Sequence, residues 1–138
     1  MKRHVIGVLS LFLLLAPAAE AVAKDVCVMS DSGVTIVFRK VAPLNPGGVI
    51  PLTGLYVTPG VPGAPYPCIG AAAMNADGSR IQVGIFCHVL LDKNSFAWDW
   101  TATDQTLAGS GTDDENGDNL GEDPLIISSV PCELVAIP

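Results

Sequence analysis

Hydrophobic and polar residues alternate with a period of two along most of the chain, and no segment shows a convincing helical spacing of 3.6 residues. Glycine and proline recur between the alternating segments, which is typical of turns. The pattern predicts an all-β protein, an antiparallel up-and-down meander of about eight strands. The predicted strands are Val26–Ser30, Val34–Val41, Val49–Thr58, Cys68–Asn75, Arg80–Leu91, Phe96–Thr103, Thr106–Thr112 and Leu125–Ile137.

The dipeptide Asp77-Gly78 predicts the register of the central hairpin. Asp-Gly is a strong signal for a two-residue β-turn, and a turn there sets Cys68 opposite Cys87. Opposed strand residues have Cα atoms ~4.5–5.5 Å apart, a separation that a disulfide tolerates. The same face then carries the opposed pairs Gly70/Ile85, Ala72/Val83 and Met74/Ile81, and we expect it to be the core.

Two further turns extend this face. A turn centred on Lys93-Asn94 sets Trp100 opposite Cys87, and one centred on Asp104-Gln105 sets Trp100 opposite Gly109. A glycine opposite an indole is expected to make room for the ring. The remaining expected pairs are Leu91/Phe96, Val89/Trp98, Trp98/Gly111, Asp99/Ser110 and Thr103/Thr106.

Cys27 and Cys132 remain once Cys68 is paired with Cys87. A bond between them ties the first strand to the last, which are neighbours in a meander only if the sheet closes on itself. The pattern therefore favours a closed or nearly closed small barrel, with a two-sheet β-sandwich as the alternative. In the chain-entropy model a bond closing so long a loop stabilises the fold by ~4–5 kcal/mol.

The first 23 residues are expected to be a signal peptide. Lys2, Arg3 and His4 precede an apolar run from Val5 to Ala16, and Ala21-Val22-Ala23 fits a signal-peptidase site. The run is too short to span a membrane as a helix. We expect a single disulfide-stapled domain at 24–138, with no transmembrane segment after cleavage, that is secreted, periplasmic or at the cell surface.

Net charge narrows the range of partners. Without Lys2, Arg3 and Glu20 the chain keeps five basic and thirteen acidic residues, a net charge of −8. So acidic a protein is not expected to bind nucleic acid or an anionic membrane surface.

Six of the carboxylates lie between Asp113 and Asp123. Neither glycine of this stretch puts oxygen ligands at all the positions that an EF-hand requires. An irregular calcium site remains as a minor alternative, with Asp113, Asp114, Asp118 and Glu122 as ligands, and no other cofactor is expected. The other interpretations are a solvated connection between strands and an acidic contact surface for a basic partner.

Phe96, Trp98 and Trp100 are spaced by two, so their rings share one face of a strand. They either fill the barrel interior or line a pocket for a small apolar ligand. The proline-rich segment 58–67 is a stiff candidate for protein recognition, with Tyr66 as its anchor. Together these four aromatic residues are the candidate ligand-binding residues.

The sequence therefore favours an exported, non-enzymatic binding module for a small apolar molecule or a protein. One alternative is a structural or cell-surface protein that self-associates through the face carrying Ile69 and Phe86. Another is a small hydrolase using His88, although no Gly-x-Ser-x-Gly elbow is present. The segments PLTGLYV (51–57) and FAWDWTATDQTLAGSG (96–111) are similar in general character to small secreted meander barrels of the avidin and lipocalin kind, which implies the fold alone.

Overall fold

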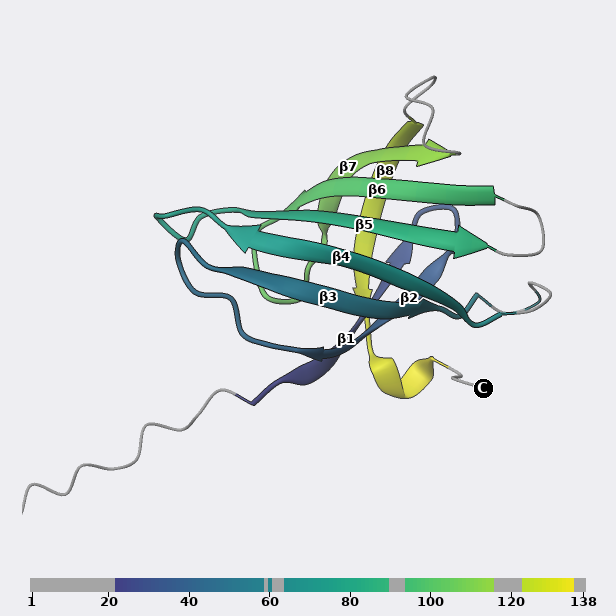
Figure 1. Ribbon diagram of the computed structural model, residues 1–138, viewed down its shortest axis with the longest axis horizontal. Coiled ribbons are helices and arrows are strands. Elements are labelled where there is room, and N and C mark those ends of the chain that lie inside the picture. Colours follow the sequence, from purple (N-terminus) through teal and green to yellow (C-terminus); the bar gives the residue numbers. More distant parts are fainter. Residues whose placement is uncertain (1–21, 59, 61–63, 90–93, 116–122, 136–138) are drawn as a thin grey trace, which may run out of the picture.

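The computed structural model describes residues 22–58, 60, 64–89, 94–115 and 123–135. Eight antiparallel strands follow one another around a closed barrel (Figure 1). The predicted meander barrel is confirmed, and the alternative of a two-sheet sandwich is wrong. The strands are β1 (Lys24–Ser30), β2 (Thr35–Val41), β3 (Val49–Tyr56), β4 (Tyr66–Met74), β5 (Ile81–Val89), β6 (Asn94–Ala102), β7 (Gly109–Glu115) and β8 (Asp123–Val130).

The barrel closes where β1 pairs with β8, through a register that sets Cys27 opposite Val130. Cys27 is bonded to Cys132 with the Cα atoms 5.3 Å apart, and Cys68 to Cys87 at 4.2 Å, so both predicted disulfides are confirmed. The last strand is shorter than expected. Pro131 cannot donate to a ladder, and a 3-10 turn, η1 (Cys132–Leu134), follows it outside the sheet.

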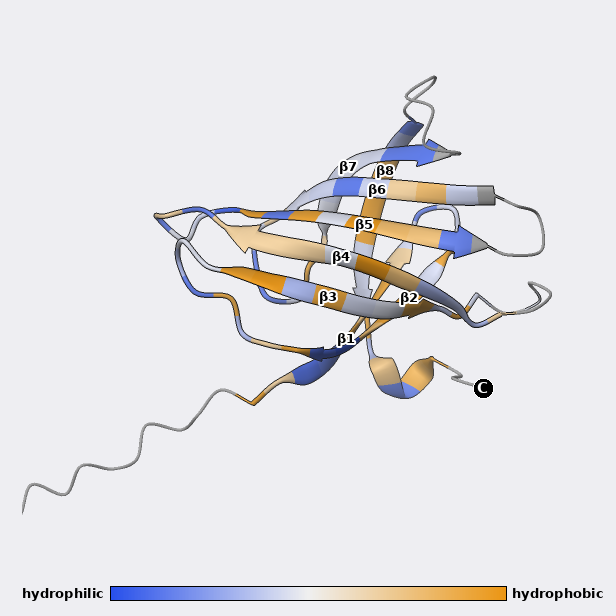
Figure 2. Ribbon diagram, viewed as in Figure 1, coloured by the Kyte–Doolittle hydropathy of each residue, from blue (hydrophilic) through white to orange (hydrophobic). Residues whose placement is uncertain are grey.

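Buried and exposed residues alternate along the strands, so successive side chains point to the inside and the outside of the barrel. Figure 2 shows the hydropathy of the residues along each strand. Inward residues form one core of fully buried side chains, in which Trp98, Trp100 and Phe38 are the largest. A second, smaller cluster lies on the outside of β1 and β2, where Cys27, Val37 and Val57 are covered by the segment around η1. The Cys27–Cys132 bond therefore lies in an outer cluster, separate from the barrel interior.

The β4–β5 pairing agrees with the prediction at every pair from Cys68/Cys87 to Met74/Ile81. The next register is wrong by four residues, because Cys87 lies opposite Phe96 and Trp100 lies opposite Val83. The connection is 90–93, centred two residues earlier than expected. A shift by an even number of residues keeps each side chain on its face, so the predicted core face is still correct.

The β6–β7 register is wrong by two residues for a similar reason. Trp100 lies opposite Gly111 and Trp98 opposite Asp113, because the connection 103–108 is longer than the expected two-residue turn. Consequently β7 begins three residues later than expected and runs to Glu115. The first part of the acidic stretch is strand, whereas we expected the strand to end at Thr112.

Gly109 and Gly111 are required by the backbone of β6 rather than by the indoles. A Cβ at Gly109 would overlap the carbonyl oxygen of Thr101, and one at Gly111 would overlap that of Asp99. We expected these glycines to make room for the indole rings, but the atoms that exclude a side chain there belong to the backbone of β6. The two glycines allow β7 to approach the backbone of β6 closely.

The barrel has two ends, which we name by their connections. The capped end carries connections 42–48, 75–80 and 103–108, and the aromatic end is where β1, β3, β5 and β7 end and β2, β4, β6 and β8 begin. At the capped end Leu44 and Leu107 are buried in the core. Gln105 joins the two loops, since its Oε1 accepts a bond from the Leu44 N–H and its Nε2 donates one to the Leu44 carbonyl, both at 3.0 Å.

Candidate functional site: the aromatic end of the barrel

A row of five aromatic rings runs through the interior toward the aromatic end. Its members contact one another in the order Tyr66, Tyr56, Phe96, Trp98 and Trp100, with ring centroids 6.0, 5.9, 5.1 and 6.5 Å apart. The strand period explains the row, because Phe96, Trp98 and Trp100 are successive inward positions of β6. The inward Tyr56 of β3 and Tyr66 of β4 continue it from Phe96. The structure thus brings together all four predicted ligand-binding residues, Phe96, Trp98, Trp100 and Tyr66.

Tyr56 is the member of the row that the sequence analysis did not single out. It lies on an inward position of β3 and pairs directly with Tyr66. The sequence could have indicated this position, because Tyr56 is two residues from Gly54 and four from Leu52. This spacing places all three residues on one face of the same strand.

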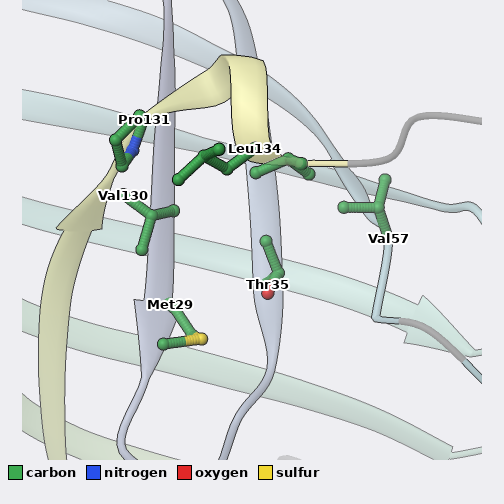
Figure 3. A pocket seen from close by; sticks show the side chains of 7 residues that line it. Met29, Thr35, Val57, Val130, Pro131 and Leu134 are labelled. Atoms are coloured by element: carbon green, nitrogen blue, oxygen red, sulfur yellow. The ribbon is translucent and has the colours of Figure 1, made fainter.

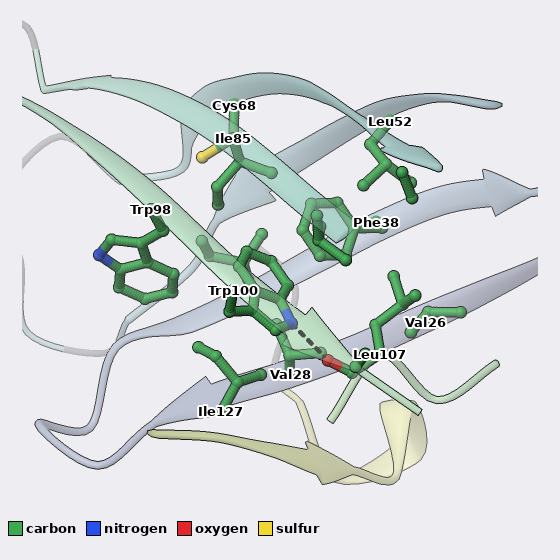
Figure 4. Packing of buried hydrophobic residues seen from close by; sticks show 14 of the residues in the cluster. Val26, Val28, Phe38, Leu52, Cys68, Ile85, Trp98, Trp100, Leu107 and Ile127 are labelled. Carbon is green, nitrogen blue, oxygen red and sulfur yellow. Dashed lines mark hydrogen bonds between the residues drawn. The ribbon is translucent and has the colours of Figure 1, made fainter. Parts of the chain in front are cut away.

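The two tryptophans differ in how their indole N–H groups are satisfied. Trp100 Nε1 donates to the carbonyl of Leu107 at 2.7 Å (Figure 4). Trp98 is equally buried, at 1% exposure, yet its Nε1 has no hydrogen-bond partner among the described residues. The Trp98 nitrogen points away from the packed cluster around Trp100 and Phe38 (Figure 4). A buried donor left unpaired carries a desolvation cost, and such an atom calls for an explanation.

A carboxylate lies on the same face as this N–H. Asp113 is opposite Trp98 in the β6–β7 ladder, so its side chain is on the inner face beside the aromatic row. Asp114, the next residue, is opposite Ala97 and so lies on the outer face. A negative charge at the aromatic end favours neutral or cationic ligands over anionic ones.

This alternation bears on the predicted calcium ligands. Asp113 and Asp114 lie on opposite faces of one strand, so their carboxylates diverge. Asp118 and Glu122 lie outside the described residues. Among the residues that the structure describes, no group of three or more His, Cys, Asp or Glu side chains could hold a metal ion. The calcium site stays a prediction for the full acidic stretch.

Tyr66 does not lie at the tip of the proline-rich segment. It is the first residue of β4, and its side chain is buried in the core. Pro65 and Pro67 on either side are exposed, and residues 59 and 61–63 lie outside the described residues. Tyr66 therefore contributes to the barrel interior, and recognition by the segment itself stays a prediction.

His88 is exposed on the outer face of β5, opposite Ser95. Asp99 is exposed on the same face of β6 but lies opposite Gly84, four residue pairs farther along the ladder. Glu133, the acidic residue of η1, is exposed and lies outside the strands. These positions do not assemble a nucleophile, a base and an acid at one point.

A hollow lies outside the barrel, next to η1. It is an apolar groove of about 250 Å³ between the first two strands and the C-terminal turn (Figure 3). Its lining residues are Met29, Thr35, Val57, Val130, Pro131, Leu134 and Val135. A further hollow of about 250 Å³ near Gln105 is lined in part by Val22, Val26 and Val41.

Lowered pKa values occur at the capped end. Asp25 has its pKa lowered first by the backbone N–H of Lys40, and then by the side chain of Arg39 at 2.8 Å. The pKa of Asp104 is lowered by the hydroxyl and the backbone N–H of Thr106. Ser79 lowers the pKa of Asp77 in the same way within its turn. Asp77 and Asp104 stabilise turns and Asp25 joins β1 to β2, so none of the three belongs to the aromatic end.

Comparison with family models, curated proteins and solved structures found no match to this chain. None of the described residues forms a helix that is long and apolar enough to cross a membrane. The two disulfides favour an oxidising compartment. Interpretation of function therefore depends on the barrel itself.

Proposed function

We propose that the protein is an exported, non-enzymatic binding module that takes a small apolar ligand at the aromatic end of the barrel. The observation that carries the proposal is the buried N–H of Trp98, which lies between Phe96 and Trp100 in the aromatic row and has no partner among the described residues. A ligand with a carbonyl or ether oxygen would supply the missing acceptor, while its apolar part would pack on the rings.

The row of rings supports an apolar ligand with some polar character. Ligand pockets are lined mainly by apolar and aromatic side chains, with a few polar groups that set orientation. Here the rings provide the apolar lining, and Trp98 and Asp113 provide the polar groups on the inner face. The inward carboxylate argues for a neutral or positively charged molecule.

The test is a titration with Nile red, a neutral dye whose carbonyl can accept a hydrogen bond and whose emission rises in apolar surroundings. We expect saturable binding that also changes the intrinsic tryptophan emission. Trp98→Phe keeps an aromatic ring but removes the donor, and should weaken binding about 5- to 30-fold, as the loss of one hydrogen bond implies. Trp100→Phe is the matched control, since its N–H is already bonded to Leu107.

Native mass spectrometry of protein purified from its own host completes the test. A small molecule retained by the wild type and lost in Trp98→Phe would identify the ligand class. Absence of dye binding together with a ligand-free mass would overturn the proposal, and a dye affinity equal in both tryptophan variants would remove the role of Trp98.

A further inference from the structure

Two aspartates face each other on the inner side of the barrel, beside Trp98. Asp113 of β7 lies directly opposite Trp98 of β6 and, in the next ladder, directly opposite Asp123 of β8. Opposed residues of an antiparallel pair share a face, and Asp123 is two residues from the buried Leu125 on the same strand. Trp98, Asp113 and Asp123 therefore form a row across three strands on the inner face, where β7 ends and β8 begins.

The neighbouring row, closer to the capped end, carries no charge. Trp100 lies opposite Gly111, and Gly111 lies opposite Leu125, which is 3% exposed. One inward position farther along the strands, Asp113 is partly buried and Asp123 is exposed. The inner face thus changes from apolar to acidic as it reaches the aromatic end.

The described Lys and Arg residues lie at the opposite end. Lys24 begins β1, Arg39 and Lys40 lie near the end of β2, and Arg80 lies in the connection between β4 and β5. All four are therefore next to the capped end, and none of the described Lys and Arg residues lies at the aromatic end. Like charges directly opposite each other destabilise a sheet, so a positive ligand between the two aspartates would be stabilising.

The indole N–H of Trp98 is an independent sign of a ligand at this level. Trp98 is 1% exposed, its Nε1 has no hydrogen-bond partner among the described residues, and this nitrogen points away from Trp100 (Figure 4). An N–H donor needs an acceptor, which a metal ion is not. Calcium also takes about six to eight oxygen ligands, and the described residues include no group of three or more His, Cys, Asp or Glu that could hold a metal ion.

We propose that the ligand is an organic cation, an inference that rests on the binding function proposed above. It is a quaternary or protonated amine joined to an apolar body that carries an oxygen acceptor. The amine lies at Asp113 and Asp123, the oxygen accepts a hydrogen bond from Trp98 Nε1, and the apolar body packs on the aromatic row. The faces of aromatic rings, those of tryptophan above all, also attract organic cations.

The experiment compares two esters that have the same shape and differ in charge. Benzoylcholine has a quaternary ammonium, 3,3-dimethylbutyl benzoate has a carbon atom in its place, and both keep a carbonyl for Trp98. Competition with Nile red on the full disulfide-bonded protein gives the two affinities. We expect benzoylcholine to bind about 10-fold more tightly, and this preference should decrease as the salt concentration rises.

Substitutions by asparagine locate the preference. Asp113→Asn and Asp123→Asn each remove one charge at nearly constant size, and each should weaken benzoylcholine binding about 3-fold. Both together should remove most of the preference and leave the affinity for the neutral ester unchanged. Asp114→Asn is the matched control, because it makes the same change in net charge on the outer face of the same strand, opposite Ala97. It should leave the preference intact.

The outcomes separate this inference from the binding function itself. If neither ester nor Nile red binds, both proposals are overturned. If Nile red and the neutral ester bind and benzoylcholine binds no better, the binding function stands and the cationic ligand is overturned. Equal losses in Asp113→Asn and Asp114→Asn would replace a site between the two aspartates by a general effect of charge, and would overturn the inference as well.

Two controls complete the experiment. Displacement of benzoylcholine by calcium at micromolar concentration would assign the two aspartates to a metal and overturn the organic cation. Thermal unfolding of each variant confirms that the barrel is intact. Asp123 is exposed, so Asp123→Asn still decides the outcome if Asp113→Asn does not fold.

Discussion

The two ends of the barrel satisfy their polar groups in opposite ways. At the capped end the Trp100 N–H bonds the Leu107 carbonyl, and Gln105 bonds both backbone groups of Leu44. At the aromatic end the neighbouring Trp98 is just as buried, but its N–H is unpartnered among the described residues. The difference indicates that the capped end is built for stability. The aromatic end retains a buried hydrogen-bond donor that no described residue satisfies.

The largest expected effect tests how the barrel is held closed. Replacing Cys27 and Cys132 by alanine should lower the free energy of unfolding by ~4–5 kcal/mol, because the bond closes a loop of about one hundred residues. Replacing Cys68 and Cys87, which are 19 residues apart, should cost ~3 kcal/mol. Urea denaturation of both double variants gives the two values. A larger loss for the Cys68–Cys87 pair would mean that the central hairpin, near the aromatic end, governs stability.

Leu107→Ala tests the capped end itself. Leu107 is fully buried although it lies in a loop, so its truncation should cost ~2–5 kcal/mol through the lost burial and the cavity left behind. Leu134→Ala is a matched control, because Leu134 is 80% exposed and should change stability by less than ~0.5 kcal/mol. Chemical denaturation compares the two leucines. Similar values would show that Leu107 does not anchor the capped end.

The two tryptophans offer the most direct comparison of the ends. Trp100→Phe leaves the Leu107 carbonyl without its donor, so it should cost ~1–3 kcal/mol more than Trp98→Phe, which leaves no described group unpaired. Both changes remove the same volume, and the difference between them isolates the hydrogen bond. Thermal and urea unfolding measure it. A greater loss from Trp98→Phe would indicate that Trp98 has a partner at the aromatic end.

The smallest expected effect concerns acid. Because the folded protein lowers the pKa of Asp25 and Asp104 below the ordinary value of 3.8, their ionised forms stabilise the fold above that pH. This contribution should disappear as the pH falls from about 4 through the lower pKa of the folded state. Both groups are exposed, so each should contribute less than ~1 kcal/mol. Asp25→Asn should therefore destabilise at pH 7, and this effect should shrink as the pH falls below about 4. A constant difference across that range would contradict the assignment.

The fold was predictable from the sequence because its strongest signals are local. Asp77-Gly78 determines the register that brings Cys68 to Cys87. Cys27 and Cys132 are then left to pair with each other, and that bond requires the sheet to close into a barrel. The errors in the next two registers arose in longer connections, where no dipeptide marks the centre of the turn. They left the core face correct because each error was an even number of residues.

The contrast between the ends was not predictable in this way. Leu107 has a φ of +62°, a conformation that a leucine rarely adopts and that local sequence does not announce. The carbonyl of this same Leu107 accepts the hydrogen bond from the Trp100 indole. Whether that indole N–H is paired therefore depends on the backbone conformation of the loop. Period-two spacing correctly placed both indoles inside the barrel. It carries no information about which of their N–H groups has a partner.

Closure of the ladder between β1 and β8 has a consequence for recognition. In an open sheet the two outermost strands offer unpaired backbone groups, which other chains use to add a strand or to form fibrils. Each strand of this described barrel has a neighbour on both sides, so no such template is exposed. A binding partner therefore cannot add a strand to this sheet, and recognition of the outer wall of the barrel depends on side chains.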